Sequence, residues 1–351
     1  MRHVALICSI ILWGLSLGLG AAGVWAQDTG GTTAPAVTAP LLPAGLQWST
    51  DAELALAAAR AAGRPIYVYI WARYNPDCVK MADETLAYDQ VVAQLASLQL
   101  VALDAHTHAN FAFFDKYKIP YFRVEGPNGE EVPPGVAVSG GAGRYPTHLF
   151  LDAQGREVYR MYGFVEGKGF AVRLGQVTEI LKARENLDAD PDSPSAELRV
   201  GHLYMQMVVL TEARNHLERA LQLDPQNRAG VVPDARLDLT IIGIPDDPAK
   251  SVPTLQQWQK ENAAHPRRLE ALYYEAAANV AAAEALMAAA PEGTTGLTKE
   301  ANARLDAAVR LLLVFKQSKP GSPEHESQWY LPAMALITGI DVARQPPPKL
   351  P

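Results

Sequence analysis

The residues with the most distinctive chemistry form the stretch Asn75-Pro76-Asp77-Cys78, which follows a run of aromatic and β-branched residues. A cysteine near the start of a helix is a potential nucleophile, because the helix dipole and the free backbone amides there stabilise a thiolate. Disulfide exchange within one chain needs a second cysteine to resolve the mixed disulfide. The only other cysteine in the sequence is Cys8, which lies within the first ten residues. Two-cysteine exchange chemistry is therefore not expected within this chain.

The same four residues also suit the start of a helix that has no redox role. Asn75 is a favoured N-cap residue, Pro76 is favoured at the next position, and Asp77 places a carboxylate in the first turn. In this interpretation, which we favour, Cys78 is a small buried hydrophobic residue. In the alternative, Cys78 works as a single thiol that depends on a cysteine of a partner protein.

Three histidines extend the set of residues that could bind or react. His106 and His108 follow a predicted strand, and His148 begins another, so all three could lie at the end of the sheet that carries Cys78. Cysteine and histidine together could bind copper or zinc. Two histidines in an i, i+2 loop are more commonly solvated, so we predict neither a metal nor any other cofactor. The sequence also lacks the nucleophile-elbow, His-Glu-x-x-His and Walker patterns.

Composition and charge bound the class of protein. The chain has 351 residues, of which 48% are hydrophobic and 20% are charged, which is typical of globular domains and excludes wholesale disorder. The formal net charge is −7 and no cluster of lysine and arginine stands out, so nucleic acid is not an expected partner. The length allows two ordinary domains.

The first 26 residues are typical of an export signal. Residues 4–19 are apolar apart from small residues, and Val24-Trp25-Ala26 suits a signal peptidase that cleaves after Ala26. An uncleaved membrane anchor is the alternative, and it is the only membrane contact that we expect. Either way the body of the protein would be periplasmic or otherwise extracytoplasmic. Residues 27–45, rich in Gly, Thr, Ala and Pro, are predicted to be a flexible linker.

Strands and helices alternate in the next part of the chain. The patterns predict strands over residues 65–71, 98–103, 147–151 and 157–162. They predict helices over residues 51–62, 76–86, 111–117 and 170–184, the first of them capped by Ser49 or Thr50. This order indicates an α/β sandwich.

Residues 46–184 resemble the exported branch of the thioredoxin-like superfamily. The matching stretches are Leu46-Gln47-Trp48, Gly63-Arg64-Pro65, residues 71–81 with Glu84-Thr85, Tyr145-Pro146-Thr147, and residues 151–155. The family normally carries an aromatic residue followed by Cys-x-x-Cys. In this comparison Tyr74 takes the aromatic position, Asn75 that of the attacking cysteine, and Cys78 that of the resolving cysteine.

The resemblance also implies a cis-proline that presents backbone groups to an extended peptide by strand addition. Pro146, flanked by Tyr145 and Thr147, is the preferred match, and Pro120 is the alternative. With Pro146 as the match, residues 120–144 are an insertion beside the site, within a thioredoxin-like domain of residues 46–185.

The rest of the chain is predicted to be mainly helical. Residues 186–195 form an acidic, Pro- and Ser-rich linker, a helical domain covers residues 196–344 with breaks near 230–253, 291–297 and 319–323, and residues 345–351 are a Pro-rich tail. Residues 194–227 resemble a tetratricopeptide repeat, whose signature positions are matched by Gly201, Tyr204, Ala213, Ala220 and Pro225. One repeat cannot bury its own faces, so similar helix pairs are expected after it.

The sequence thus predicts an α/β thioredoxin-like sandwich followed by an all-α, tetratricopeptide-like domain. The expected function is that of an exported adaptor or chaperone-like module that binds other envelope proteins or extended peptides, without two-cysteine redox chemistry. The first alternative is an oxidoreductase-like protein that uses Cys78 as a single thiol, and the second is a metal carrier.

Overall fold

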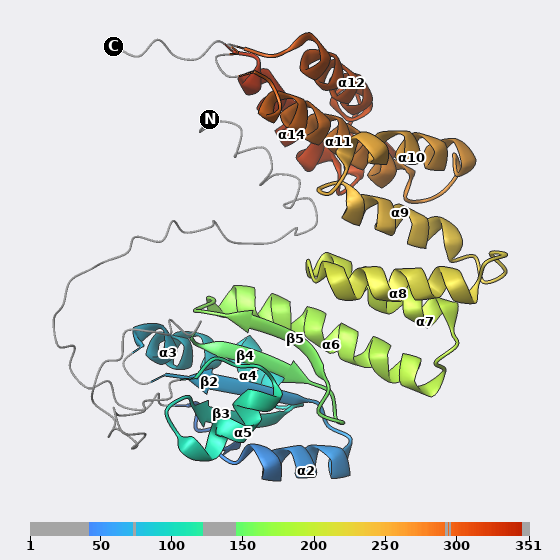
Figure 1. Ribbon diagram of the computed structural model, residues 1–351. Helices are drawn as coiled ribbons and strands as arrows, with labels where there is room; N and C mark the ends of the chain where they lie inside the picture. Colours follow the sequence, from blue (N-terminus) through green and yellow to red (C-terminus); the bar gives the residue numbers. More distant parts are fainter. Residues whose placement is uncertain (1–41, 73–74, 122–144, 292–293, 295, 346–351) are drawn as a thin grey trace, which may run out of the picture. The chain divides into compact units, whose positions relative to one another are not determined.

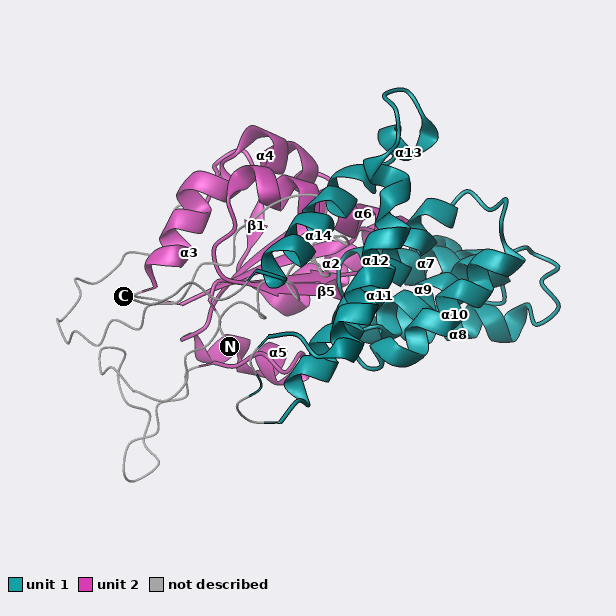
Figure 2. Ribbon diagram, turned by 90° about the horizontal axis from the view of Figure 1, so that it is seen from above, with its two compact units in different colours: residues 1–17, 183–351 teal, residues 18–182 magenta. Residues whose placement is uncertain are grey.

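The computed structural model describes residues 42–72, 75–121, 145–291, 294 and 296–345 (Figure 1). Tyr74, the predicted export signal, most of the predicted linker, residues 122–144 of the predicted insertion and nearly all of the Pro-rich tail lie outside these residues. The described chain divides into two compact units, with the boundary between Lys182 and Ala183 (Figure 2). We describe each unit by itself.

The N-terminal unit is built on one mixed β-sheet. Its strands are β1 (Trp48–Ser49), β2 (Ile66–Trp71), β3 (Gln99–Asp104), β4 (Thr147–Leu151) and β5 (Glu157–Tyr162), in the order β1-β3-β2-β4-β5. β3 pairs in parallel with β1 and β2, whereas β4 pairs in antiparallel fashion with β2 and β5. The four longer strands confirm the predicted α/β sandwich, and the two-residue β1 was not predicted.

Both faces of the sheet are covered by helices. On one face Ile66, Val68 and Ile70 of β2 join the hydrophobic core formed with α2 (Ala52–Ala62) and α5 (Phe111–Lys116). On the other face Tyr67 packs against Phe170 of α6 (Gly167–Ala189). Because alternate residues of a strand point to opposite faces, a strand in this position needs large apolar or aromatic side chains throughout.

Two local signals explain the boundaries of α2. The Asp51 carboxylate accepts a hydrogen bond of 2.9 Å from the Leu54 amide, so Asp51 is the N-cap, and the prediction of Ser49 or Thr50 was wrong by one or two residues. Gly63 ends the helix in a left-handed conformation with φ of 62°. Glycine adopts this conformation without the steric cost that a Cβ atom adds.

The helix predicted over residues 76–86 has two parts. α3 (Pro76–Lys80) is α-helical, and Met81–Leu86 continues it as a π-helix, followed by α4 (Asp89–Leu95). The buried Thr85 hydroxyl in the π-helical part donates a hydrogen bond of 2.5 Å to the Val165 carbonyl oxygen. A short 3-10 helix (His108–Asn110) precedes α5.

The predicted linker over residues 186–195 is partly wrong, because α6 continues to Ala189. The first residue after the helix that opposes continuation is Pro191, which disfavours the helical conformation at the position before it. The acidic character of this stretch therefore does not end the helix, and the proline sets the boundary.

The C-terminal unit is helical. After α6 its helices are α7 (Pro194–Gln206), α8 (Leu210–Leu223), α9 (Val232–Gly243), α10 (Pro248–Glu261), α11 (Arg268–Ala288), α12 (Lys299–Lys316), α13 (Pro323–Glu326) and α14 (Tyr330–Ala343). The break expected near 230–253 was wrong, because α9 and the first six residues of α10 occupy most of it. Pro233 and Pro248 lie in the first turns of these helices, where a missing amide costs nothing. Among the described residues, no helix is long and apolar enough to cross a membrane.

Candidate functional site

Asn75 caps α3 and also ties it to a distant turn. Its side-chain oxygen accepts a hydrogen bond of 2.9 Å from the Asp77 amide, and its Nδ2 donates one of 3.1 Å to the Tyr145 carbonyl oxygen. The first contact satisfies a backbone donor that the helix itself leaves free. The second joins residues that are 70 positions apart in the sequence. An amide therefore occupies the place where thiol exchange would need a nucleophile.

Cys78 is a buried thiol. It is 1% exposed, and burial raises its pKa to about 12, against a smaller lowering by the Ala72 amide, which lies 3.5 Å from the sulfur. The thiol is therefore protonated at neutral pH, and the reactive thiolate form is not populated. This geometry agrees with the interpretation of Cys78 as a small core residue.

Tyr69 lies directly beneath this turn. It projects from β2, and its hydroxyl donates a hydrogen bond of 2.5 Å to the Cys78 carbonyl oxygen. Desolvation by burial raises the pKa of Tyr69, so its proton stays on the phenol. The sequence did not identify Tyr69 as a site residue. No sequence pattern indicates that a tyrosine in a buried strand will contact a helix nine residues further along the chain.

The turn from Tyr145 to Thr147 is also closed. The Tyr145–Pro146 peptide bond is cis, at the proline that the sequence favoured over Pro120. Tyr145, Pro146 and Thr147 are all buried, and the Tyr145 hydroxyl donates a hydrogen bond to the Pro120 carbonyl oxygen. The Pro146 carbonyl oxygen accepts one of 2.7 Å from the Gly163 amide. These three residues are therefore buried, and the Tyr145 and Pro146 carbonyl oxygens already accept hydrogen bonds from Asn75 and Gly163.

The three histidines do not assemble into one site. His148 is fully buried, with Nδ1 lying 2.8 Å from the Tyr67 hydroxyl and Nε2 lying 3.2 Å from the Gly163 carbonyl oxygen. His106 lies 3.2 Å from an Asp104 carboxylate oxygen, and His108 packs against an aromatic ring of α5. Within the described part of the chain, no group of three or more His, Cys, Asp or Glu residues is arranged to hold a metal ion.

Residues singled out in the helical region mediate close packing of α7 against α8. A Cβ atom on Gly201 would lie 2.8 Å from Leu217 Cγ and 3.2 Å from the Ala213 carbonyl oxygen. Tyr204 is buried and stacks on His216 with ring centroids 5.7 Å apart. Ala213 and Ala220 are also fully buried, whereas Pro225 is exposed just beyond the end of α8.

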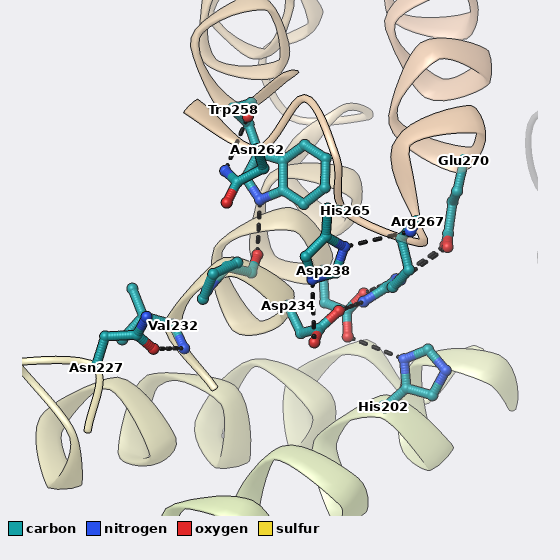
Figure 3. Close-up of polar contacts among 11 residues, drawn as sticks. His202, Asn227, Val232, Asp234, Asp238, Trp258, Asn262, His265, Arg267 and Glu270 are labelled. Atoms are coloured by element: carbon teal, nitrogen blue, oxygen red, sulfur yellow. Dashed lines mark hydrogen bonds and ion pairs between the residues drawn. The ribbon is translucent and has the colours of Figure 1, made fainter. Parts of the chain in front are cut away.

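A buried polar cluster that sequence reasoning missed joins α7, α9 and the connection into α11 (Figure 3). Asp238 is 0% exposed and contacts both His202 Nδ1, at 2.9 Å, and the Arg267 guanidinium. Arg267 also bonds Glu270, at 2.8 and 2.9 Å, and Asp234, at 3.0 Å. These residues are widely separated in the sequence and form no motif, so only the fold brings them together.

Comparison with known proteins agrees with the geometry of the N-terminal unit. A family model described as a thioredoxin-like domain matches residues 52–178. Among solved structures, the solution structure of a thioredoxin from Thermus thermophilus matches with 23% identity and a TM-score of 0.31, covering 42% of this chain and 97% of that one. No curated protein matches the chain. The family match places a thioredoxin-like domain in the N-terminal part, and a mostly helical part follows it.

Proposed function

We propose that the protein is an exported adaptor that binds other proteins of the cell envelope and performs no disulfide exchange of its own. The proposed absence of disulfide exchange rests on one observation. An amide that is hydrogen-bonded on both sides stands at the attacking position, and the remaining thiol is 1% exposed with a pKa raised to about 12. Neither group can attack a disulfide at neutral pH.

Export is the part of the proposal that rests on sequence alone. It depends on the apolar stretch of residues 4–19 and the small residues before Gln27. In an oxidising compartment a chain with a single buried thiol avoids unwanted intermolecular disulfides. The burial of Cys78 suits such a compartment.

The helical part is proposed to be tetratricopeptide-like and to supply the main binding surface. The close approach of α7 and α8 at Gly201 supports this assignment, because such repeats use small residues where their two helices cross. Stacked helix pairs expose extended surfaces that suit protein partners. Since Tyr145 and Thr147 are buried, a peptide could reach the cis-proline turn only after displacement of existing contacts, so we assign that turn a secondary role.

The decisive experiment compares the wild-type protein with Asn75→Cys in dithiothreitol-driven reduction of insulin. We expect no acceleration by the wild type. Asn75→Cys restores a thiol at the start of α3 with the Cys-x-x-Cys spacing, and it should accelerate the reaction. Asn75→Cys combined with Cys78→Ala is the matched control, because it keeps the new thiol and removes the resolving one. Acceleration by the wild type would instead support the single-thiol alternative.

The binding half of the proposal is tested separately. A photoreactive residue is placed at Gln206 of α7 or Arg236 of α9, both exposed in the helical unit, and the control position is Leu54 of the other unit. We expect the same envelope proteins to be crosslinked from the two helical positions and not from Leu54. Identical products from all three positions would argue against a specific surface on the helices.

A further inference from the structure

The last described helix, α14, is apolar on both of its faces. Its inner side is formed by Ala333, Leu336, Ile337 and Ile340, which are buried. On the opposite side Leu331 is 73% exposed, Val342 is 54% exposed, and Ala335 and Thr338 are exposed between them. From Tyr330 to Ile340 the helix has no charged side chain. A helix that is apolar all round is typical of a buried position, so the exposed side is a surface that a partner would cover.

The four exposed residues form one straight stripe. Their spacing of four, three and four residues places them within about 60° of arc on an ideal helix. This is the spacing by which two helices pack knobs into holes along a seam. We call these residues, Leu331, Ala335, Thr338 and Val342, the α14 stripe.

The order of side chains along the α14 stripe indicates which partner would cover it. Read in either direction, the stripe runs from a large aliphatic residue through two small residues to another large aliphatic one. An antiparallel second copy would therefore place Leu331 opposite Val342 and Ala335 opposite Thr338, each pair occurring twice about a two-fold axis. The small residues fall at the axis, where they let the two backbones approach closely. No charge lies on the stripe itself, so the contact buries no unpaired ion.

We propose that the protein self-associates as a two-fold dimer through the α14 stripe, with the two copies of α14 antiparallel. A contact between two helices of 14 residues lies at the small end of specific interfaces. The dimer is therefore expected to be in exchange with the monomer, so that its population depends on protein concentration.

Sedimentation equilibrium of the purified protein, between about 5 and about 200 µM, tests the association. The mass should rise from that of a single chain towards twice that value. Leu331→Glu should weaken the association at least tenfold, since it buries an unpaired charge at each end of the contact. Leu54→Glu is the matched control, because Leu54 is 67% exposed in the other unit, and it should change nothing. A monomer throughout the range overturns the proposal, as does a monomer that instead sediments with lipid vesicles.

Crosslinking tests the antiparallel arrangement. Leu331→Cys and Val342→Cys are made singly in a Cys78→Ala background, and the two variants are mixed under mild oxidation. The mixture should form a covalent dimer across the Leu331–Val342 pair. Either variant alone should not, because like positions would lie about 16 Å apart along the helix axis, beyond the reach of a disulfide. Crosslinking by the single variants to the same extent would overturn the antiparallel register.

Discussion

At the scale of single residues, His148 is a base that the fold keeps neutral. Burial lowers its pKa to about 4, and its two nitrogens face the Tyr67 hydroxyl and the Gly163 carbonyl oxygen. A neutral ring with its proton on Nε2 satisfies both neighbours, whereas a proton on Nδ1 would remove the acceptor of the Tyr67 hydroxyl. In the unfolded chain the histidine titrates near its ordinary value of about 6.5.

Acid is expected to destabilise the folded protein because of His148. Between about pH 6.5 and pH 4 the unfolded chain binds a proton that the folded protein does not, so acid lowers the free energy of unfolding by roughly 3 kcal/mol in total. Denaturant titrations across this range, compared with His148→Gln, measure the effect. Glutamine can donate and accept hydrogen bonds without titrating, so the variant should lose less stability on acidification. Equal losses in both proteins would show that His148 is not the titrating group.

The contacts of Asn75 and Cys78 show which features of the site can be predicted from the sequence and which cannot. The capping role of Asn75 and the burial of Cys78 were predictable, because both depend on the start of one helix. The bond from Asn75 to Tyr145 and the packing of Tyr69 under Cys78 were not, because they join β2, α3 and a turn that the chain reaches later.

At the scale of elements, a substitution of Gly201 tests how closely α7 and α8 must approach each other. A Cβ atom there would meet Leu217 Cγ at 2.8 Å and the Ala213 backbone at 3.2 Å, and the backbone contact cannot be relieved by a rotamer change. Overpacking costs typically 1–3 kcal/mol, and the better helix propensity of alanine returns about 1. Gly201→Ala should therefore lower the free energy of unfolding by about 1–2 kcal/mol, or leave it near neutral if the helices shift apart.

The control for this substitution is Gly175→Ala. Gly175 lies inside α6, and no packed neighbour lies within 4 Å of the position that a Cβ atom would take, so alanine there should stabilise by up to about 1 kcal/mol. Thermal or urea denaturation of both variants measures the difference. A gain at Gly201 equal to the gain at Gly175 would contradict the proposed close packing.

Arg267 tests the buried cluster that joins three elements of the helical unit. Arg267→Met removes the cation from Asp238 and Glu270, which are 0% and 8% exposed. It should lower the free energy of unfolding by about 3–5 kcal/mol, because it leaves these carboxylates buried without a positive partner. Asp238→Asn in the same protein should recover part of this loss. Arg219→Met is the control, since Arg219 pairs with the largely exposed Asp192, and it should cost less than about 1 kcal/mol. Similar costs at both arginines, measured by urea denaturation, would contradict a structural role for the cluster.

The elements that were predicted correctly are those with a strong local pattern. β2, β4 and β5 are short runs of β-branched and aromatic residues bounded by turn residues, and all three were placed within one residue. α9 and the first part of α10 were missed, because Pro233, Pro248 and Pro253 resemble loop residues. Pro233 and Pro248 lie in the first turn of a helix, where proline is tolerated. Sequence alone does not show that a proline lies in a first turn unless the start of the helix is already known.

At the scale of the whole molecule, the order of the two parts was predictable and the state of the site was not. Alternation of strands and helices followed by helices alone indicates the fold class without any knowledge of tertiary contacts. The accessibility of Cys78 and of the Tyr145–Thr147 turn depends on how separate segments pack against each other. A sequence pattern can therefore predict the thioredoxin-like fold and still leave open whether its usual site can react or bind.

Net charge gives a final prediction about the proposed dimer. Each chain carries a formal charge of −7, so two copies repel each other, whereas the α14 stripe contributes only uncharged side chains. Salt screens the repulsion, since the Debye length falls from about 30 Å at 0.01 M to about 8 Å at 0.15 M, and it leaves hydrophobic contact largely unchanged. Sedimentation equilibrium should therefore show tighter association at 0.15 M than at 0.01 M sodium chloride. Weaker association in salt would mean that ion pairs, and not the α14 stripe, hold the two copies together.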